Sequence, residues 1–296
     1  MKILISGASG LVGSLLGKRL EVAGHTVVAL SRAPTGSGVV WDPAAGYLDP
    51  TALTGIDAAI HLAGENLAAG RWTVARKEKF RASRVNGTRL LSTTLAQLDH
   101  PPKVLVCASA IGYYGDRGNE SLNEASPPGH GFLADMCAAW EAAADPAATA
   151  DIRVVHLRLG LVLSASGGAL AKMRLPFSLG LGGRLGNGRQ YMSWISLEDT
   201  VRAFCHALED ATISGPLNCT APLAVTNAEF TRCLGSILRR PTIFPVPAFA
   251  LKILFGEMAR PLMLEGSRVY PEKLLAAGFH FEHEALAPAL RWALAH

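Results

Sequence analysis

The chain has 296 residues, of which 49% are hydrophobic and 18% are charged. This composition fits one large domain, or a nucleotide-binding domain with a smaller partner, and argues against extensive disorder. The net charge of +4 is not gathered into a long run, so it favours a small anionic ligand over a nucleic acid.

Three features of the sequence indicate its compartment. Five cysteines are scattered without a Cys-x-x-Cys pair, so we expect reduced thiols and no metal site. A strand that starts at Lys2 runs straight into glycines and leaves no room for a signal peptide. The apolar run at 245–255 is too short, and too interrupted by proline, to span a bilayer. We therefore expect a cytoplasmic protein, monomeric or homodimeric, with no membrane partner.

The first predicted element is the strand KILIS (2–6), followed by a glycine-rich loop and a helix that ends at Gly24. A second strand is predicted at 26–30. Further apolar runs lie at 57–64, 103–110 and 152–163, with helical stretches at 72–98 and 131–148 between them. Strands that are apolar on both faces and alternate with helices indicate an α/β fold, a Rossmann-type doubly wound parallel sheet.

Beyond about residue 165 the pattern changes. Residues 166–190 are rich in glycine and arginine and predict a lobe made mostly of loops. An amphipathic helix is predicted at 196–210, and a capping box of Thr226 and Glu229 starts another. One more short helix is predicted between Pro271 and Gly278, and the carboxyl-terminal third is expected to be mostly helical.

These patterns predict two units. A Rossmann domain is expected at 1–165, completed by about 196–220. A small, mostly helical carboxyl-terminal lobe is expected at 166–195 and 221–296, folded back over the open edge of the sheet on the substrate side.

The loop GASGLVG lies between the first strand and the first helix. Glycines at 7, 10 and 13 permit a tight turn, a close approach of the backbone to a pyrophosphate, and packing of the helix on the strand. The helix N-terminus then offers N–H groups and the positive end of its dipole. The expected cofactor-binding residues of this loop are Gly7, Ser9, Gly10, Leu11, Val12 and Gly13.

The end of the second strand predicts the type of dinucleotide. An NAD-binding strand ends in an acid, which accepts from the ribose 2′-hydroxyl. Here the strand ends in Ser31 and Arg32, with no acid. Because a guanidinium is the natural bidentate partner of a 2′-phosphate, we predict NADP as the cofactor, with Ser31 and Arg32 in its site.

Four motifs, GxxGxxG, HLAG, ASAIGYYG and RLGLVL, occur in that order, and the chain resembles the extended and atypical short-chain dehydrogenase/reductases (SDRs). It is most similar to the epimerase-like family often labelled nucleoside-diphosphate-sugar epimerase, which carries a carboxyl-terminal domain of unknown function. The resemblance covers essentially the whole chain, and its more specific motifs are AGENL, SRV, LPFSLGLGGRLGNGRQ and NAEF.

The resemblance implies further cofactor contacts. Leu62 and Ala63 would pass under the adenosine, and Asp42 would lie near the adenine. Arg84 and Lys79 would approach the cofactor from the long helix. Without the resemblance, these two residues predict only a solvated helix face. The complete set implied by the resemblance is Asp42, Leu62, Ala63, Gly64, Lys79, Arg84, Ala108 and Leu161.

The chain departs from the resemblance at the catalytic residues. The extended enzymes carry a serine four residues before Tyr-Gly, and that place is taken here by Ala110, with Ser109 one residue away. Phe132 stands where the catalytic tyrosine belongs, and Met136 stands where the lysine belongs. Neither can transfer a proton, so any chemistry must use another group. Tyr113 is the predicted proton donor, and Ser109 would hydrogen-bond a substrate oxygen.

Two hypotheses therefore stay open. One is an NADP-dependent oxidoreductase or epimerase acting on a small substrate. Nucleotide-linked and anionic molecules are the candidate substrates. Arg174, Arg184 and Arg189 are weak candidates for holding such an anion, and His130 is expected at the surface. The other hypothesis is an NADP-binding sensor or regulatory protein, which the loss of the tyrosine and lysine favours.

Overall fold

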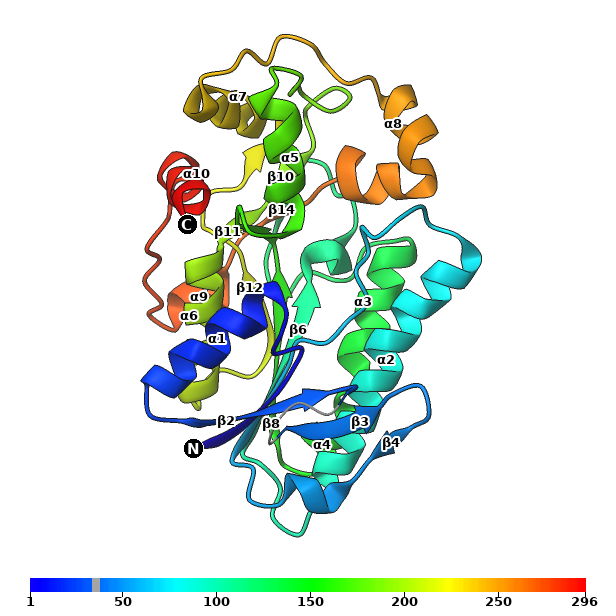
Figure 1. Ribbon diagram of the computed structural model, residues 1–296, viewed down its shortest axis with the longest axis vertical. Coiled ribbons are helices and arrows are strands. Elements are labelled where there is room, and N and C mark those ends of the chain that lie inside the picture. Colours follow the sequence, from blue (N-terminus) through cyan, green and yellow to red (C-terminus); the bar gives the residue numbers. More distant parts are fainter. Residues whose placement is uncertain (34–37) are drawn as a thin grey trace.

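A central sheet between two layers of helices organises the molecule (Figure 1). The computed structural model describes residues 1–33 and 38–296. The strands of the central sheet are β1 (Lys2–Ser6), β2 (Thr26–Ser31), β3 (Val39–Asp42), β4 (Tyr47–Leu48), β5 (Ala58–His61), β6 (Val104–Ala110), β8 (Arg153–Leu159) and β12 (Gly215–Cys219). The helices around it are α1 (Leu11–Val22), α2 (Val74–Ala96), α3 (Phe132–Ala142), α4 (Asp145–Thr149), α6 (Leu197–Glu209) and α9 (Glu272–Ala276).

The sheet has eight strands in the order β12-β8-β6-β5-β1-β2-β3-β4. Neighbouring strands run parallel, except that β4 is antiparallel to β3. The strand β1 lies between β2 and β5, so the winding of the chain reverses there. Ligands of doubly wound sheets bind at this switch point, beyond the carboxyl ends of the strands. The predicted Rossmann-type α/β fold is confirmed.

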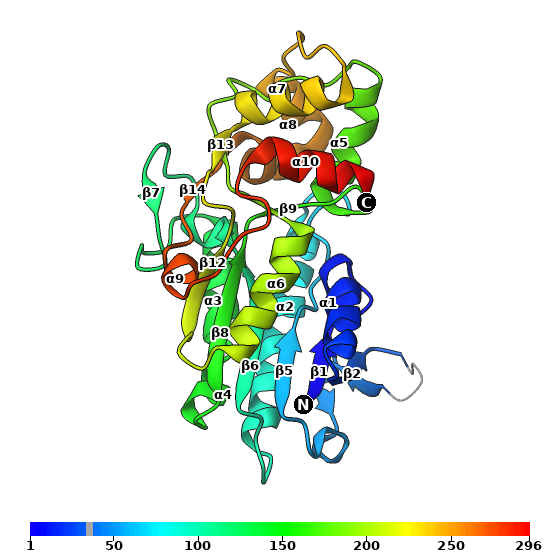
Figure 2. The same ribbon diagram turned by 90° about the vertical axis from the view of Figure 1, so that its left-hand side faces the viewer.

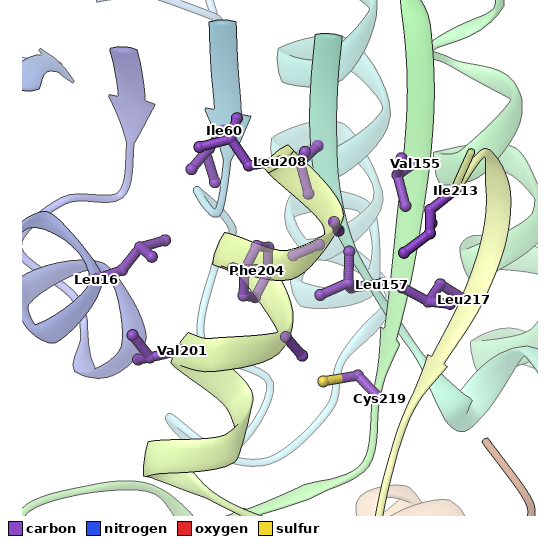
Figure 3. Close-up of a cluster of buried hydrophobic side chains, with 14 of the residues drawn as sticks. Leu16, Ile60, Val155, Leu157, Val201, Phe204, Leu208, Ile213, Leu217 and Cys219 are labelled. Carbon is purple, nitrogen blue, oxygen red and sulfur yellow. The ribbon is translucent and has the colours of Figure 1, made fainter. Parts of the chain in front are cut away.

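Each face of the sheet is covered by its own apolar core. Figure 3 shows the face under α1 and α6, where Phe204 of α6 lies between Leu16 of α1 and Leu157 of β8. The opposite face packs against α2 and α4 through residues such as Leu91 and Leu95. Burying each of these side chains contributes about 1.5–3 kcal/mol. Because both faces of the sheet are covered in this way, the strands carry apolar residues on both sides and form continuous apolar runs in the sequence.

A mostly helical lobe sits above the carboxyl edge of the sheet (Figure 2). Its helices are α5 (Gly168–Ser178), α7 (Asn227–Leu238), α8 (Ala248–Phe255) and α10 (Leu286–Ala295), with the short turns η3 (Gly256–Met258) and η4 (Arg260–Leu264). We call this set the carboxyl-terminal lobe. The capping box of Thr226 and Glu229 is confirmed at the start of α7. Small strand pairs connect the lobe to the sheet domain: β9 (Leu161–Leu163) with β11 (Trp194–Ser196), and β10 (Tyr191–Met192) with β13 (Val225–Thr226).

Two expectations for the carboxyl-terminal half differ from the structure. Residues 168–178 form α5 where mostly loop was predicted, because Leu170 and Phe177 are buried in the core of the lobe. Residues 268–279 return to the sheet domain instead of staying in the lobe. There β14 (Arg268–Val269) pairs with β7 (Ser121–Leu122), and Leu274 and Phe279 join the main core. In the described part of the chain, no helix has the length and apolar character that crossing a membrane requires.

Candidate functional site

The glycine loop lies at the switch point and is shaped by close backbone contacts. Gly7 has a φ of 71°, and a Cβ there would lie 3.0 Å from the Ala63 nitrogen. A Cβ on Gly13 would lie 2.2 Å from the Gly7 carbonyl oxygen, so α1 can approach the loop only with glycine at this place. A Cβ on Gly10 would meet only the Gly7 oxygen, at 3.2 Å, and Gly10 has extended backbone. Gly7 and Gly13 are therefore needed by the fold, whereas Gly10 leaves space above the loop.

The N-terminus of α1 faces that space without a capping side chain. The N-cap is Gly10, no side chain within residues 1–33 and 38–296 caps the helix there, and the first turn contains no acidic residue. Its N–H groups and the positive end of the helix dipole therefore remain available for an anion. This arrangement fits the pyrophosphate of a dinucleotide.

The neighbouring HLAG segment is held against the loop by Ser6. The Ser6 hydroxyl accepts from the Leu62 and Ala63 nitrogens at 3.1 and 3.2 Å. Its own proton is therefore directed to His61 Nδ1, 2.6 Å away, and the imidazole carries its proton on Nε2. Burial lowers the pKa of His61 to about 4, so His61 is a neutral support for the residues expected under the adenosine.

This buried histidine predicts a loss of stability in acid. The unfolded chain binds a proton at His61 below about pH 6.5, whereas the folded chain binds it only below about pH 4. Stability from His61 is therefore complete above pH 6.5 and falls by about 3 kcal/mol as the pH drops to 4. We expect His61→Gln, whose amide oxygen can accept from Ser6, to flatten that part of the curve in urea denaturation. An unchanged pH dependence in His61→Gln would contradict the assignment.

The residues expected around the adenosine lie at the same edge of the sheet. Arg32 follows β2 directly and is exposed, as the pairing with a 2′-phosphate requires. Asp42 ends β3, and its Oδ1 accepts from the nitrogens of Ala44 and Ala45 at 2.9 and 3.2 Å, which closes the turn to β4. The contact of Asp42 with an adenine stays a prediction.

Arg84 places a half-buried cation beside the HLAG segment. A Cβ on Gly64 would lie 3.3 Å from the guanidinium carbon, and that carbon is 5.1 Å from the centre of the Trp140 ring. The guanidinium donates to the Phe80 carbonyl, but its Nε has no partner within the described residues. Burial lowers the pKa of Arg84. No carboxylate in the described part of the chain forms an ion pair with it. Such a site fits a polar or anionic ligand.

Other residues expected at the cofactor are spread more widely. Lys79 is exposed on α2 and is not brought to Arg84. Ala108 is buried within β6, and Leu161 is half-buried at the start of β9. The roles of these three residues stay predictions. Arg174, which lies in α5, and Arg184, Arg189 and His130, which lie outside the helices, are all exposed.

A buried polar network lies at the carboxyl ends of β6 and β8. Ser109 Oγ donates to Glu141 Oε1 at 2.7 Å. Arg158 makes a bidentate ion pair with the same carboxylate, at 2.8 and 2.7 Å, and donates to the Tyr114 hydroxyl at 2.9 Å. The Tyr114 hydroxyl donates to Asn218 Oδ1 at 2.7 Å. These groups satisfy one another, so Ser109 can offer a substrate only its acceptor lone pairs.

The network contains ionised and neutral members. Burial works to lower the pKa of Arg158, but the hydrogen bonds and charge of Glu141 outweigh it and raise that pKa. Burial raises the pKa of Tyr114, although Arg158 opposes this, so Tyr114 is a neutral and fully buried phenol. Glu141 and Arg158 were missed in the sequence analysis. An arginine in the middle of the apolar run 152–163 was the available signal.

Tyr113 lies against this network at the end of β6. It belongs to the turn η2 (Ile111–Tyr114) and is half-buried. The centre of its ring is 3.5 Å from the Arg158 guanidinium carbon. Its place at the carboxyl edge of the sheet is where substrates bind in such folds. The role of proton donor stays a prediction.

The predicted places of the missing tyrosine and lysine are in an apolar cluster. Met136 is 2% exposed and packs with Trp72 and Phe80, and the Phe132 ring lies 5.4 Å from the Trp72 ring. Met258 of the carboxyl-terminal lobe completes this cluster. The face of α3 that holds Phe132 and Met136 therefore supports the lobe.

Comparisons with known proteins agree with this geometry. Residues 3–219 match the model of the NAD dependent epimerase/dehydratase family, and residues 246–293 match a domain of unknown function, DUF1731. Epimerase family protein Mb2239 of Mycobacterium bovis is 46% identical over 293 residues, covering 98% of this chain and 97% of that protein.

Two solved structures are similar over the whole chain. Human epimerase family protein SDR39U1 (isoform 2), crystallised with NADPH, is 34% identical with a TM-score of 0.91, covering 100% of this chain and 99% of that one. The nucleoside-diphosphate sugar epimerase of Corynebacterium glutamicum is 33% identical with a TM-score of 0.83. That match covers 99% of this chain and 58% of that one.

Proposed function

The chain belongs to the NAD-dependent epimerase/dehydratase family, and on this premise we propose that it is an NADP(H)-dependent oxidoreductase or epimerase of a small molecule. The observation that carries the proposal is the uncapped N-terminus of α1 above the glycine loop, at the switch point of the sheet. The NADPH bound to human SDR39U1 supports the choice of cofactor. Nucleotide sugars are the first substrate class to test, because a relative is described as a nucleoside-diphosphate sugar epimerase.

Different residues would hold the parts of the dinucleotide. The N–H groups of the first turn of α1 would bind the pyrophosphate. Leu62 and Ala63, fixed by Ser6, would support the adenosine, and Arg32 would pair with the 2′-phosphate. Arg84, a half-buried cation with no carboxylate partner among the described residues, would donate to oxygens of the cofactor beyond Gly64. The donor set is therefore rich in cations and N–H groups, as a phosphorylated cofactor requires.

Arg32 should make the protein prefer NADPH over NADH. A charge-assisted contact contributes about 1.5–3 kcal/mol, which corresponds to a preference of roughly ten- to hundredfold. We expect Arg32→Ala to lose most of this preference while its affinity for NADH stays near the wild-type value. Titration calorimetry with both cofactors measures the effect. Equal affinities of the wild type for NADPH and NADH would refute the role of Arg32.

Tyr113 is the proposed proton donor of the reaction. Bound NADP(H) would supply or accept the hydride. The Arg158 guanidinium lies against the Tyr113 ring and would stabilise the negative charge that the phenol oxygen carries after it has donated its proton. Glu141 holds Arg158, and Ser109 donates to Glu141, so both act as positioning residues. Since Ser109 donates to Glu141, it would accept a hydrogen bond from a substrate hydroxyl.

A screen of nucleotide sugars and other small metabolites, read by the absorbance of reduced nicotinamide, tests this proposal. With a substrate found, Tyr113→Phe should lower turnover by about 10²- to 10⁴-fold, the usual contribution of a positioned acid. Phe132→Leu should retain turnover per folded molecule, because no proton passes through that ring. Full turnover in Tyr113→Phe would exclude Tyr113 as the acid.

A sensor or regulatory protein is the second candidate function. It is favoured by the apolar cluster in which Met136 is buried and Phe132 is partly buried, since neither side chain can transfer a proton. Tight NADPH binding without turnover of any compound in the screen would favour this function over the enzyme.

A further inference from the structure

The loop 65–72 directly follows the HLAG segment and is held by the carboxyl-terminal lobe. The Arg71 guanidinium donates to the carbonyls of Ile253 and Leu254, at 2.5 and 3.2 Å, in the last turn of α8. Lys172 of α5 donates to the Ala68 carbonyl at 2.9 Å. Figure 1 shows α8 (orange) above the end of the molecule where α2 begins. Two helices of the lobe, α5 and α8, therefore form hydrogen bonds with one loop of the sheet domain.

An apolar contact lies next to these polar ones. The Trp72 indole donates to the Leu67 carbonyl at 2.9 Å, which folds the loop, and its ring lies in the cluster that contains Met136. Met258 of η3 is 5% exposed and enters the same cluster, and Phe255 packs beside it. The lobe thus docks on the face of α3 from which the proton-transfer residues are missing.

An ion pair spans the same boundary. Lys77 of α2 and Glu257 of η3 lie 2.8 Å apart, with half of the Glu257 side chain exposed. At the other end of the loop, the Glu65 nitrogen donates to Ser83 Oγ on α2 at 3.1 Å, one residue before Arg84. The loop 65–72 is therefore fixed at both ends, by the hydrogen bond of the Glu65 nitrogen to α2 and by those of Arg71 to the lobe. Only a few residues separate Gly64 from the contacts with the lobe.

We infer that the loop 65–72 couples binding of the dinucleotide to docking of α8 and η3 on the sheet domain. The inference rests on the proposed NADP(H) binding. A ligand that orders Gly64 and Arg84 restricts the loop, and a restricted loop presents Arg71 and Trp72 to the lobe. Since coupling between two sites is reciprocal, a weakened dock must also weaken retention of the cofactor. This coupling also explains why Phe132 and Met136 stand in the places of the tyrosine and the lysine. The face of α3 that holds the lobe must be apolar, and these two side chains make it so.

Two measurements on the intact protein test the coupling. Hydrogen exchange of residues 248–258 should slow when NADPH is added, although none of these residues is expected to touch the cofactor. In stopped-flow fluorescence, Arg71→Ala should release NADPH about five- to fiftyfold faster than the wild type, within the usual range of coupling between sites. Lys252→Ala is the matched control, because it removes an exposed cation from α8 outside the contact and should release NADPH at the wild-type rate.

The ion pair provides a test that does not depend on Arg71. Lys77→Glu should speed NADPH release, and the exchanged pair Lys77→Glu with Glu257→Lys should restore it. The inference is overturned if NADPH binds tightly but leaves exchange at 248–258 unchanged, or if Arg71→Ala releases NADPH at the wild-type rate. A wild-type protein that does not bind NADPH would instead refute the proposed function.

Discussion

Gly10→Val is expected to weaken NADPH binding by at least about a hundredfold, which corresponds to about 2.7 kcal/mol, while leaving the fold intact. Gly10 has extended backbone that valine can adopt, and an added Cβ would meet only the Gly7 oxygen, at 3.2 Å. The valine methyl groups would project into the space above the loop and keep a pyrophosphate from the N–H groups of α1. Fluorescence titration with NADPH, beside thermal unfolding of the apoprotein, measures both effects.

Two further substitutions make this test specific. Gly17→Val lies on the same helix, where an added Cβ meets nothing within 4 Å, so wild-type affinity is expected. Gly13→Val should disturb the fold itself, because its Cβ would lie 2.2 Å from the Gly7 oxygen. If folded Gly10→Val protein binds NADPH as the wild type does, the glycine loop is not the pyrophosphate site.

Arg158→Met is expected to lower the free energy of unfolding by about 3–5 kcal/mol, the usual cost of removing one partner from a buried ion pair. The Arg158 side chain is 3% exposed, and its loss leaves the Glu141 carboxylate buried with Ser109 as its remaining side-chain donor. The hydroxyl of Tyr114 also loses a donor. Urea denaturation at pH 7 measures the change.

The combination of Arg158→Met with Glu141→Gln should recover part of that loss, since it removes the uncompensated charge. Arg117→Met is the control, because Arg117 pairs with Glu120 at the surface and should change stability by less than about 1 kcal/mol. If Arg158→Met costs no more than Arg117→Met, the network is not a buried electrostatic unit.

The sequence predicted those parts of the site that depend on residues close together in the chain. The strand, the glycine loop and the helix of 2–24 follow from apolar periodicity and from the positions of three glycines. Arg32 was predicted because the end of β2 is a known position for the ribose contact. The parallel sheet followed from strands that are apolar on both faces.

The polar network and α5 could not be predicted in the same way. Glu141 and Arg158 are 17 residues apart, on a helix and on a strand, and only the crossing of α3 over the sheet brings them together. The α5 segment has two glycines at its start, Gly167 and Gly168, and a proline inside it, so its local preference for a helix is weak. Burial of Leu170 and Phe177 against the rest of the lobe decides in favour of a helix.

By itself, the sequence determined the sheet domain, the glycine loop and the absence of a tyrosine and a lysine from α3, because each of these is a property of residue types at short spacing. Only the tertiary structure shows which side chains pack on the face of α3 that holds Phe132 and Met136. Arg71 and Ile253, 182 residues apart, meet in the folded chain, and Met258 covers Met136. Contacts of this kind depend on how the carboxyl-terminal lobe folds back, and that is set by the summed burial of many apolar side chains over the whole molecule rather than by any local pattern.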